Sequence, residues 1–326
     1  MSLLVVGSVG IDTVVTPTER REQVLGGSAV YFSYAASFFT PVSMVSVVGE
    51  DFPDAHRRLL KDQGIDLAGL EVAKGKTFRW TGRYHEDLNT RDTLEVDLNV
   101  FGTFDPKVPE KDKQAEFLFL ANGAPAVQRK VLQQMKRRPK FIAADTMDLW
   151  INTARPELEK LIGEIDALVI NDSEVRLMTR HRELLRAGRE LLELGVPTVI
   201  IKKGEHGALV VNKHGHFVVP AMPLEAVTDP TGAGDSFAGG IMGYLASTGD
   251  ISAQGLRRAV AYGSVVASFT VEDFSLEMLC RIKRADIDKR FKALLAIANI
   301  EAPAVKARAK NAPAKKPMKK KKRKKK

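Results

Sequence analysis

The chain has 326 residues, 44% of them hydrophobic and 28% charged, with a single cysteine, which excludes a wholly disordered chain, a multi-span membrane protein and a scaffold held by internal disulfides. Its net charge of +10 comes from one end, because residues 302–326 hold 13 of the 50 Lys and Arg and no Asp or Glu. Residues 1–301 therefore carry 37 basic and 40 acidic side chains, a net charge of −3 that excludes a basic, nucleic-acid-binding globule.

Short β-branched runs alternate with longer amphipathic stretches over the first two thirds of the chain. We expect strands at 3–7, 42–48, 117–121, 141–144, 167–170 and 198–201, and helices at about 28–39, 53–63, 126–137, 156–163, 173–179 and 182–194. This alternation predicts an α/β fold, a three-layer sandwich in which helices cover both faces of a central, mostly parallel sheet. Ligands of such sheets bind beyond the carboxyl ends of the strands.

The N-terminal run has no basic segment, and Gly7 and Gly10 interrupt it. It therefore predicts a buried strand and not a signal peptide. No other apolar run reaches the length of a membrane span, so we expect a cytoplasmic protein.

The segment at about 76–101 interrupts the α/β pattern. Phe78 and Trp80 alternate with polar residues, and Leu94 and Val96 do the same further on. This period of two predicts half-exposed antiparallel strands. Together with a strand at about 11–16, we interpret them as a small β-lid that projects from the sheet. The pattern is also typical of a surface hairpin without a catalytic part.

The last third of the chain is mainly helical. After strands at 208–211 and 216–219, we expect helices near 233–247, 252–270, 275–283 and 286–298. We predict one domain over residues 1–300 and a Lys-rich tail over 301–326 with too little apolar bulk to fold, hence disordered. Its final eight residues, all basic, would attract nucleic acid or an anionic membrane; a solubilising tail is the alternative.

The most specific segment is Asp229-Pro-Thr-Gly-Ala-Gly-Asp235-Ser-Phe-Ala-Gly-Gly240, directly before a long apolar helical stretch. The small residues Gly232, Ala233 and Gly234 let the backbone approach a ligand closely. The helix that begins there points unpaired N–H groups and the positive end of its dipole at that ligand, which predicts an anion hole. Asp235 beside the anion can accept the proton of a hydroxyl that attacks phosphorus. The same string also fits an Asp N-cap on a glycine-rich turn.

Residues 229–240 resemble the C-terminal signature of the ribokinase-like (PfkB) carbohydrate kinases, and the resemblance extends over residues 1 to about 300. It implies a ribokinase-like sandwich with a β-lid, ATP as phosphoryl donor, Mg²⁺, and a hydroxyl of a sugar or nucleoside as acceptor. By the match, Asp235 is the catalytic base, and the backbone of residues 232–234 is the anion hole. Asp229 and Thr231 coincide with positions that some members use for a monovalent cation such as K⁺.

Asn171-Asp-Ser-Glu174 follows an apolar strand and matches the family motif N-x-x-E, which the resemblance assigns to hydrated Mg²⁺. One carboxylate and one amide suit a cation that keeps most of its waters. The same two residues also suit the capping of a helix. Lys203-Gly204-Glu-His-Gly207 resembles the T-x-G-x-x-G loop on the ATP side, with Lys203 where Thr or Ser is usual. This lysine either meets the triphosphate or is exposed in a turn.

Asp12 lies just beyond the first strand, where the family has an aspartate that binds acceptor hydroxyls. Gly26 and Gly27 match the diglycine at which the lid hinges. The chain lacks two asparagines of ribokinases: Gly10 replaces one and Tyr31 the other, which puts ribose in doubt.

Tyr31 either stacks on a nucleobase or sugar or packs in the core. We therefore predict an ATP-dependent sugar kinase, with a nucleoside kinase as the alternative. A nucleic-acid-binding protein that acts through its tail is the second class. Lids of this type take part in dimer contacts among relatives, and the sequence leaves the oligomeric state open.

Overall fold

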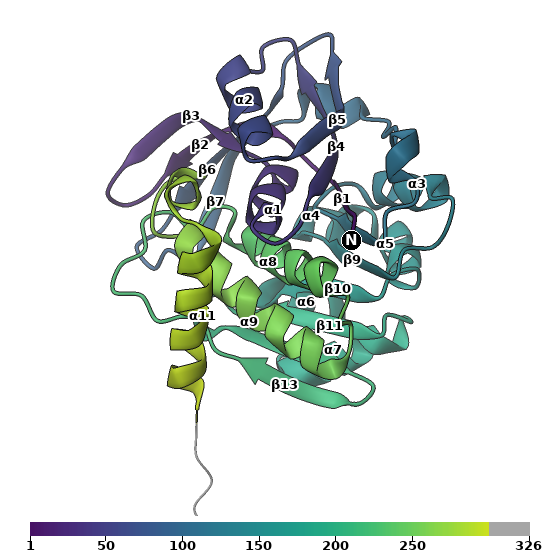
Figure 1. Cartoon of the computed structure of the whole chain (residues 1–326), viewed down its shortest axis with the longest axis vertical. Helices are drawn as coiled ribbons and strands as arrows, with labels where there is room; N and C mark the ends of the chain where they lie inside the picture. The colour runs from purple at the N-terminus through teal and green to yellow at the C-terminus, as the bar shows by residue number, and fades with distance from the viewer. Residues whose placement is uncertain (300–326) are drawn as a thin grey trace, which may run out of the picture.

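A nine-stranded sheet runs through the centre of the protein, which a computed structural model describes over residues 1–299 (Figure 1). The strands lie in the order β13, β12, β11, β10, β9, β8, β1, β4, β5. In chain order they are β1 (Leu3–Val6), β4 (Val42–Gly49), β5 (Asp66–Ala73), β8 (Phe117–Leu120), β9 (Phe141–Asp145), β10 (Ala167–Asn171), β11 (Thr198–Lys202), β12 (Ala208–Asn212) and β13 (Gly215–Val219).

Parallel pairing joins β5, β4, β1, β8, β9, β10 and β11, and β12 and β13 add to that edge in antiparallel fashion. The inner strands are apolar on both faces because helices cover both. In β1, Leu3 and Val5 belong to one hydrophobic core, whereas Leu4 and Val6 belong to the other. This explains why β1 is a continuous apolar run instead of an alternating one.

Two layers of helices enclose the sheet. The core that contains Leu3 is completed by α1 (Ser28–Ser37), α2 (Asp54–Asp62), α8 (Ala233–Thr248), α9 (Ala253–Thr270), α10 (Glu277–Arg281) and α11 (Arg284–Ala298). The core that contains Leu4 is completed by α3 (Pro125–Gln134), α4 (Asp148–Thr153), α5 (Arg155–Ile162), α6 (Asp172–Thr179) and α7 (Leu184–Glu193). Within residues 1–299, no helix is long and apolar enough to cross a membrane.

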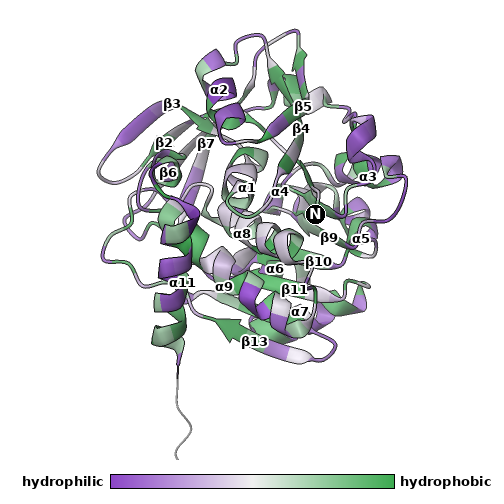
Figure 2. Ribbon diagram, viewed as in Figure 1, coloured by the Kyte–Doolittle hydropathy of each residue, from purple (hydrophilic) through white to green (hydrophobic). Residues whose placement is uncertain are grey.

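A second sheet of four strands, in the order β3, β2, β6, β7, lies beside the first (Figure 1). It contains β2 (Gly10–Val15), β3 (Arg20–Gly26), β6 (Phe78–Tyr84) and β7 (Arg91–Asp97). Because β2 begins shortly after β1 ends, this sheet leaves the large one from its carboxyl edge. Figure 2 shows β3 as hydrophilic over most of its length, in keeping with its exposed charged residues.

The predicted three-layer α/β architecture is confirmed, and a smaller sheet lies where half-exposed strands were expected. The structure adds β3, β5 and α4, which were not predicted. Each is short or largely exposed, so its sequence lacks the apolar run that marked the inner strands. The predicted tail, 301–326, lies outside the described residues.

Candidate active site

The carboxyl ends of the parallel strands meet at one edge of the large sheet, and polar residues gather there. Asp145, Asn171 and Lys202 are the last residues of β9, β10 and β11, which are neighbours in the sheet. Asn171 and Lys202 are direct partners in the register. The pairing therefore brings a carboxylate, an amide and an ammonium group together at the edge where ligands of α/β sheets bind.

Lys202 and Asp145 form an ion pair, with 3.1 Å between Nζ and Oδ2, in which Asp145 is buried and Lys202 is half-buried. Burial alone would lower the pKa of Lys202, but the neighbouring carboxylates of Asp145, Glu174 and Asp235 outweigh it and raise this pKa, so the lysine keeps its charge. Its Nζ lies 3.0 Å from the point where a Cβ on Gly234 would stand. A fixed positive charge therefore lies beside the predicted anion hole.

The predicted anion hole is the bend that leads into α8. Gly232 is its N-cap and has φ of 76°, a conformation that glycine adopts without strain. The N–H of Ala233 donates to Pro230 O (3.2 Å), so this amide is engaged. No acceptor in residues 1–299 takes the N–H of Gly232 or Gly234. The prediction thus needs a correction: of the three predicted amides, the bend leaves those of Gly232 and Gly234 unpaired, while Ala233 stabilises the bend.

Asp235 lies in the first turn of α8, directly after this bend. Burial, and secondly the negative charge of Asp145, raise its pKa to about 7, although the positive charges of Lys202 and Arg91 act in the opposite direction. A carboxylate that titrates near neutrality is a stronger base than an exposed one and is still ionised in a large fraction of molecules. Its environment therefore suits proton transfer.

Asp12 is buried on β2, with 4% of its surface exposed. Burial, followed by the charges of Asp229 and Asp235, raises its pKa to about 8, against the effect of a hydrogen bond from the Gly27 amide. Its Oδ1 is buried without a hydrogen-bond partner in the described chain. A buried polar atom without a partner is costly, so Asp12 is suited to a ligand hydroxyl.

Gly26 and Gly27 give Asp12 its space. A Cβ on Gly26 would overlap the Asp12 carboxylate, and one on Gly27 would lie 2.5 Å from Ser8 O. Gly27 also has φ of 102° and forms the N-cap of α1. These positions need glycine for close packing, whatever part they have in lid movement.

Tyr31 lines the same cavity as Asp12 and Asp235, but only 1% of its surface is exposed. Its ring occupies the space that a Cβ on Gly232 would need. The ring therefore packs against the bend and supports it, which leaves little face for stacking on a ligand. Its hydroxyl is buried without a partner in the described chain.

The N-x-x-E residues form a capping box at the start of α6. Asn171 Oδ1 accepts from the N–H of Glu174 (2.7 Å), and Glu174 Oε2 accepts from the N–H of Asn171 (2.9 Å). Burial raises the pKa of Glu174 to about 7, with Lys202 opposing and Asp145 adding to the shift. Both predicted structures, a helix cap and a polar group at the ligand edge, are present together.

Lys203 lines neither of the two cavities at this edge of the sheet, whereas Lys202 lines one of them. The prediction of Lys203 on the ATP side therefore needs correction. In a T-x-G-x-x-G spacing the first position lies two residues before the first glycine, which is Lys202, and neighbouring side chains of an extended segment point to opposite sides. Gly204 and Gly207 do line the cavity, with φ of 53° and 77°.

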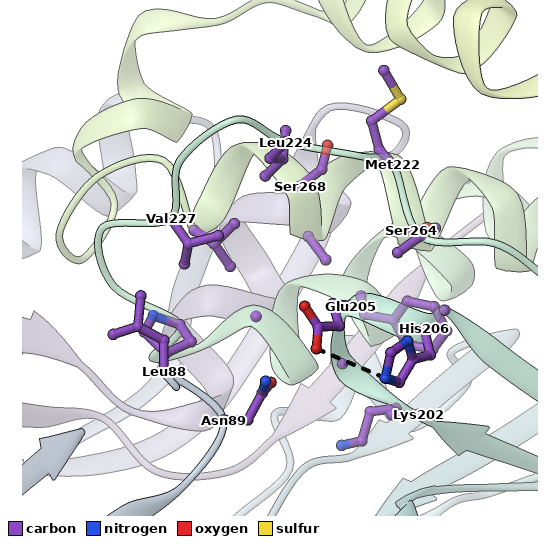
Figure 3. A pocket seen from close by; sticks show the side chains of 18 of the residues that line it. Leu88, Asn89, Lys202, Glu205, His206, Met222, Leu224, Val227, Ser264 and Ser268 are labelled. Atoms are coloured by element: carbon purple, nitrogen blue, oxygen red, sulfur yellow. Dashed lines mark ion pairs between the residues drawn. The ribbon is translucent and has the colours of Figure 1, made fainter. Parts of the chain in front are cut away.

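A cavity of about 650 Å³ opens between this loop and α8 and α9, and we call it the donor cavity (Figure 3). Figure 3 shows Asn89 and Lys202 along one side, and Met222 and Leu224 along the opposite side. One end therefore offers charge and amide N–H groups, and the other an apolar surface. This arrangement suits a ligand with an anionic end and a flat apolar end.

A second cavity of about 470 Å³ contains both Asp12 and Asp235, and we call it the acceptor cavity. It lies between the small sheet and the edge of the large one. Aromatic side chains form much of its wall: Phe78, Trp80, Phe101 and Trp150.

Arg91 of β7 also lines the acceptor cavity and lies over the Trp80 ring, 5.7 Å from its centroid. No ion pair joins it to a carboxylate within the described residues. Sequence reasoning missed Asp145, Lys202 and Arg91. The signal for the first two was a charged residue that ends an apolar strand; for Arg91, on an exposed strand, there was none.

Asp229 and Thr231 lie together at the base of the bend. Asp229 Oδ1 accepts from the N–H of Thr231 (2.8 Å), and its Oδ2 is buried without a partner in the described chain. Thr231 Oγ1 bonds the hydroxyl of Tyr84 in the small sheet (3.1 Å). The two predicted residues are thus hydrogen-bonded to each other, and Oδ2 of Asp229 remains available to a ligand.

Comparison with known proteins identifies this arrangement. The family model described as pfkB family carbohydrate kinase matches residues 2–278. The chain belongs to the pfkB family of carbohydrate kinases. The predicted resemblance is therefore confirmed, and with it the predicted enzyme class, a kinase that acts on an alcohol group.

Relatives of this pfkB family kinase include both nucleoside and sugar kinases. The cytidine kinase of Thermococcus kodakarensis is 30% identical over 251 residues, which span 75% of this chain and 88% of the relative. The nucleoside kinase of Methanothermobacter thermautotrophicus is 27% identical and covers 83% of this chain and 89% of its own. A crystal structure of a putative ribokinase II from E. coli superimposes with a TM-score of 0.75 at 21% identity, over 90% of this chain and 99% of the other. The predicted ribokinase-like fold is thereby confirmed.

Proposed function

We propose that the protein transfers the γ-phosphoryl group of ATP, with Mg²⁺, to a sugar hydroxyl of a nucleoside. The observation that carries the choice of acceptor is the wall of the acceptor cavity, a space of about 470 Å³ that is lined in part by the rings of Phe78, Trp80, Phe101 and Trp150. Flat faces of this kind stack on a nucleobase. The first two relatives, named cytidine kinase and nucleoside kinase, support the same choice.

Asp12 and Asp235 hold the two ends of the acceptor's sugar in this proposal. The unpaired Oδ1 of Asp12 takes part in a hydrogen bond to one hydroxyl, which removes the cost of a buried atom without a partner. Asp235 accepts the proton of the attacking hydroxyl as that oxygen bonds to phosphorus. The unpaired amides of Gly232 and Gly234 stabilise the charge on the phosphoryl oxygens during transfer.

Lys202 faces the phosphates from the donor cavity. Its Nζ lies beside Gly234, and its charge is held there by Asp145. A lysine at this place neutralises the triphosphate that the anion hole receives. This assignment replaces the one made for Lys203.

The residues at the strand ends fit a hydrated Mg²⁺. No cluster of three acidic, His or Cys side chains that could hold a metal directly occurs within residues 1–299. Glu174 uses one carboxylate oxygen in the capping box and keeps Oε1 to accept from a metal-bound water. Asn171 Oδ1 already accepts from the Glu174 N–H and the Ser173 hydroxyl, so its amide NH2 group would donate to a phosphate oxygen. A magnesium ion held through these waters would supply charge neutralisation between the phosphates. A structure of a putative ribokinase II from E. coli with ATP and Mg²⁺ supports this cofactor pair.

Arg91 lies on β7 of the small sheet and lines the acceptor cavity. We propose that this sheet closes as a lid over the acceptor. Burial raises the pKa of Asp235 and of Glu174, and the charge of Arg91 has a smaller effect in the opposite direction. Its guanidinium therefore lies near the carboxylates that, in this proposal, surround the transferred phosphoryl group. Closure of the lid would exclude water and add this positive charge.

A free sugar acid or deoxysugar is the second candidate acceptor. A 2-dehydro-3-deoxygluconokinase of Thermoproteus tenax is 28% identical over 73% of this chain, and a deoxyribokinase of Salmonella typhi is 32% identical over 71%. Arg91 favours the sugar acid because a guanidinium without an ion-pair partner suits a carboxylate, which a deoxysugar lacks.

An ADP-release assay over cytidine, inosine, adenosine, ribose, deoxyribose and 2-keto-3-deoxygluconate, with and without Mg²⁺, tests the proposal. We expect at least one nucleoside to exceed every free sugar in kcat/KM by about tenfold or more, the range that a stacked base contributes. A free sugar as the best acceptor would replace the first candidate by the second. Activity in K⁺ that is lost in tetramethylammonium would support a cation at Asp229 and Thr231.

We also propose two partners for the protein, nucleic acid and a second copy of this chain. The basic tail, 302–326, would bind nucleic acid weakly and with steep salt dependence. The exposed apolar residues of the small sheet, Leu94 and Val96, would support a homodimer through the lid. Retention of the protein on immobilised RNA at increasing salt tests the first proposal. The molar mass of the protein in solution tests the second.

A further inference from the structure

The small sheet, which the sequence predicts only as a lid that projects from the large sheet, contributes to both cavities. Phe78, Trp80 and Arg91 of β6 and β7 line the acceptor cavity. The turn between these strands, residues 85–90, which we call the lid turn, instead lines the donor cavity through Asp87, Leu88 and Asn89. One hairpin therefore contacts both the space for the acceptor and the space for the donor.

The lid turn holds its own shape. Asp87 accepts hydrogen bonds from the N–H of Asn89 (3.0 Å), the N–H of Thr90 (2.8 Å) and the Thr90 hydroxyl (2.7 Å). The N–H of His85 donates to Thr90 O (3.0 Å). The bonds from Thr90 are the main reason that the pKa of Asp87 lies below its usual range. This carboxylate is thus occupied within the turn.

Leu88 ties the lid turn to the rest of the small sheet. It has φ of 52°, a conformation that costs a non-glycine residue about 1 kcal/mol or more. Its side chain packs against the core formed by Val14, Tyr84 and Phe274. The turn therefore packs against β2, against β6, which carries Trp80, and against Phe274, which lies between α9 and α10.

Asn89 is the residue of the turn with free hydrogen-bonding capacity. Its side chain makes no hydrogen bond within residues 1–299, and its Oδ1 lies 3.0 Å from where a Cβ on Gly204 would stand. The lid turn thus meets the loop after β11, and Figure 3 shows Asn89 on the same side of the donor cavity as Lys202. An amide at this place can donate to a phosphate oxygen.

We propose that Asn89 binds the phosphates of the donor nucleotide, so that the donor draws the lid closed and tightens the binding of the acceptor. The inference rests on the proposed function. Because one hairpin lines both cavities, each ligand favours the same closed position. By thermodynamic linkage the donor must then strengthen acceptor binding by the same factor by which the acceptor strengthens donor binding.

The protein carries its own reporter for this coupling. The chain has two tryptophans, Trp80 and Trp150, and both line the acceptor cavity. Intrinsic fluorescence therefore gives the acceptor Kd, with and without a non-hydrolysable ATP analogue and Mg²⁺. In the wild type we expect the analogue to lower this Kd by about 5- to 150-fold.

The test compares Asn89→Ala and Asn89→Asp with Asn212→Ala. Asn212 is an asparagine beside another hairpin turn, where its Oδ1 accepts from the N–H of His214 (2.9 Å), and it lines neither cavity. Asn89→Ala should reduce the coupling to within about threefold of unity and leave the acceptor Kd without nucleotide unchanged. Asn89→Asp should weaken analogue binding further, because it opposes the phosphates, whereas a purely structural turn residue would accept Asp. Asn212→Ala should match the wild type.

Coupling that persists in both Asn89 variants, or an acceptor Kd that the analogue does not change in the wild type, would overturn the inference. Analogue binding, measured alone by calorimetry, separates it from the proposed function. If no nucleoside or sugar is phosphorylated, the proposed function fails. The inference then depends on analogue binding alone. It is overturned if the analogue Kd of Asn89→Ala and of Asn89→Asp equals that of the wild type, and it is supported if both variants bind the analogue more weakly.

Discussion

The pH dependence of kcat/KM should shift in opposite directions when the two members of the Lys202–Asp145 ion pair are neutralised one at a time. The perturbations are Lys202→Met and Asp145→Asn. Lys202 lowers the pKa of Asp235, whereas Asp145 raises it, and the resulting pKa is about 7. The base must be ionised to act, so kcat/KM should fall about tenfold per pH unit below this pKa.

The size of the shift follows from the position of Lys202. Its Nζ lies 3.0 Å from where a Cβ on Gly234 would stand, and Asp235 is the next residue, so the two charges are at most about 12 Å apart. At an effective dielectric constant of about 20, that separation corresponds to at least about 1.4 kcal/mol, or about one pK unit. Lys202→Met should therefore move the acidic limb up by about one unit, and Asp145→Asn should move it down.

The assay is ADP release at limiting acceptor between pH 5 and 9, with saturating ATP and Mg²⁺. Lys140→Met is the matched control, because Lys140 pairs with Glu116 (2.8 Å) on the surface, away from the site. Its profile should coincide with that of the wild type. If both site variants titrate at the wild-type pH, or both move in the same direction, Asp235 is not the group that limits the reaction.

Three further results are expected. Gly232→Ala should reduce kcat by at least about tenfold, because the new Cβ would overlap the Tyr31 ring. The control is Gly64→Ala, which has a similar φ (82° against 76°) but no atom within 4 Å of the new Cβ, and which should cost only about 1 kcal/mol of stability. Equal kcat values of the two variants would contradict this. Burial raises the pKa of Asp12 from 3.8 to about 8, so the folded state binds this proton more tightly than the unfolded state, and the stability that the proton contributes should be lost as the pH rises from 3.8 to about 8. In thermal melts, the Tm of Asp12→Asn should therefore rise relative to that of the wild type between pH 5 and pH 9. A difference in Tm that does not change with pH would refute the assignment. A chain without residues 302–326 should keep its kcat and KM in the ADP-release assay, and a tenfold loss would show that the tail takes part in catalysis.

Hydrophobic periodicity predicted most of the fold because the inner strands are buried on both faces. A short apolar run such as Leu3–Val6 suits a strand whose two faces are both covered by helices. The strand β5 was missed because its residues are mostly half-buried or exposed, so no apolar run marks it. The tertiary pairing with β4, which a local pattern does not contain, makes it a strand.

The site was predicted where one short segment contains its parts, and missed where the parts come from different strands. The bend and its carboxylate lie within residues 229–240, so they could be read together. The pairing of Asp145 with Lys202 joins residues 57 positions apart, and it depends on β9, β10 and β11 being neighbours. The choice of Lys203 failed for a different reason: the T-x-G-x-x-G motif was placed one residue too late, because its first position lies two residues before Gly204, at Lys202. The sequence alone therefore contained the signal for Lys202.

The central claim is that Asp235 removes the proton of the attacking hydroxyl beside the glycine bend. The most direct test is single-turnover phosphoryl transfer by Asp235→Asn, with binding of the ATP analogue measured on the same preparation. Loss of a proton-transfer group predicts a rate at least about 10²-fold lower with little change in analogue binding. A variant that keeps more than about a tenth of the wild-type rate would contradict the claim.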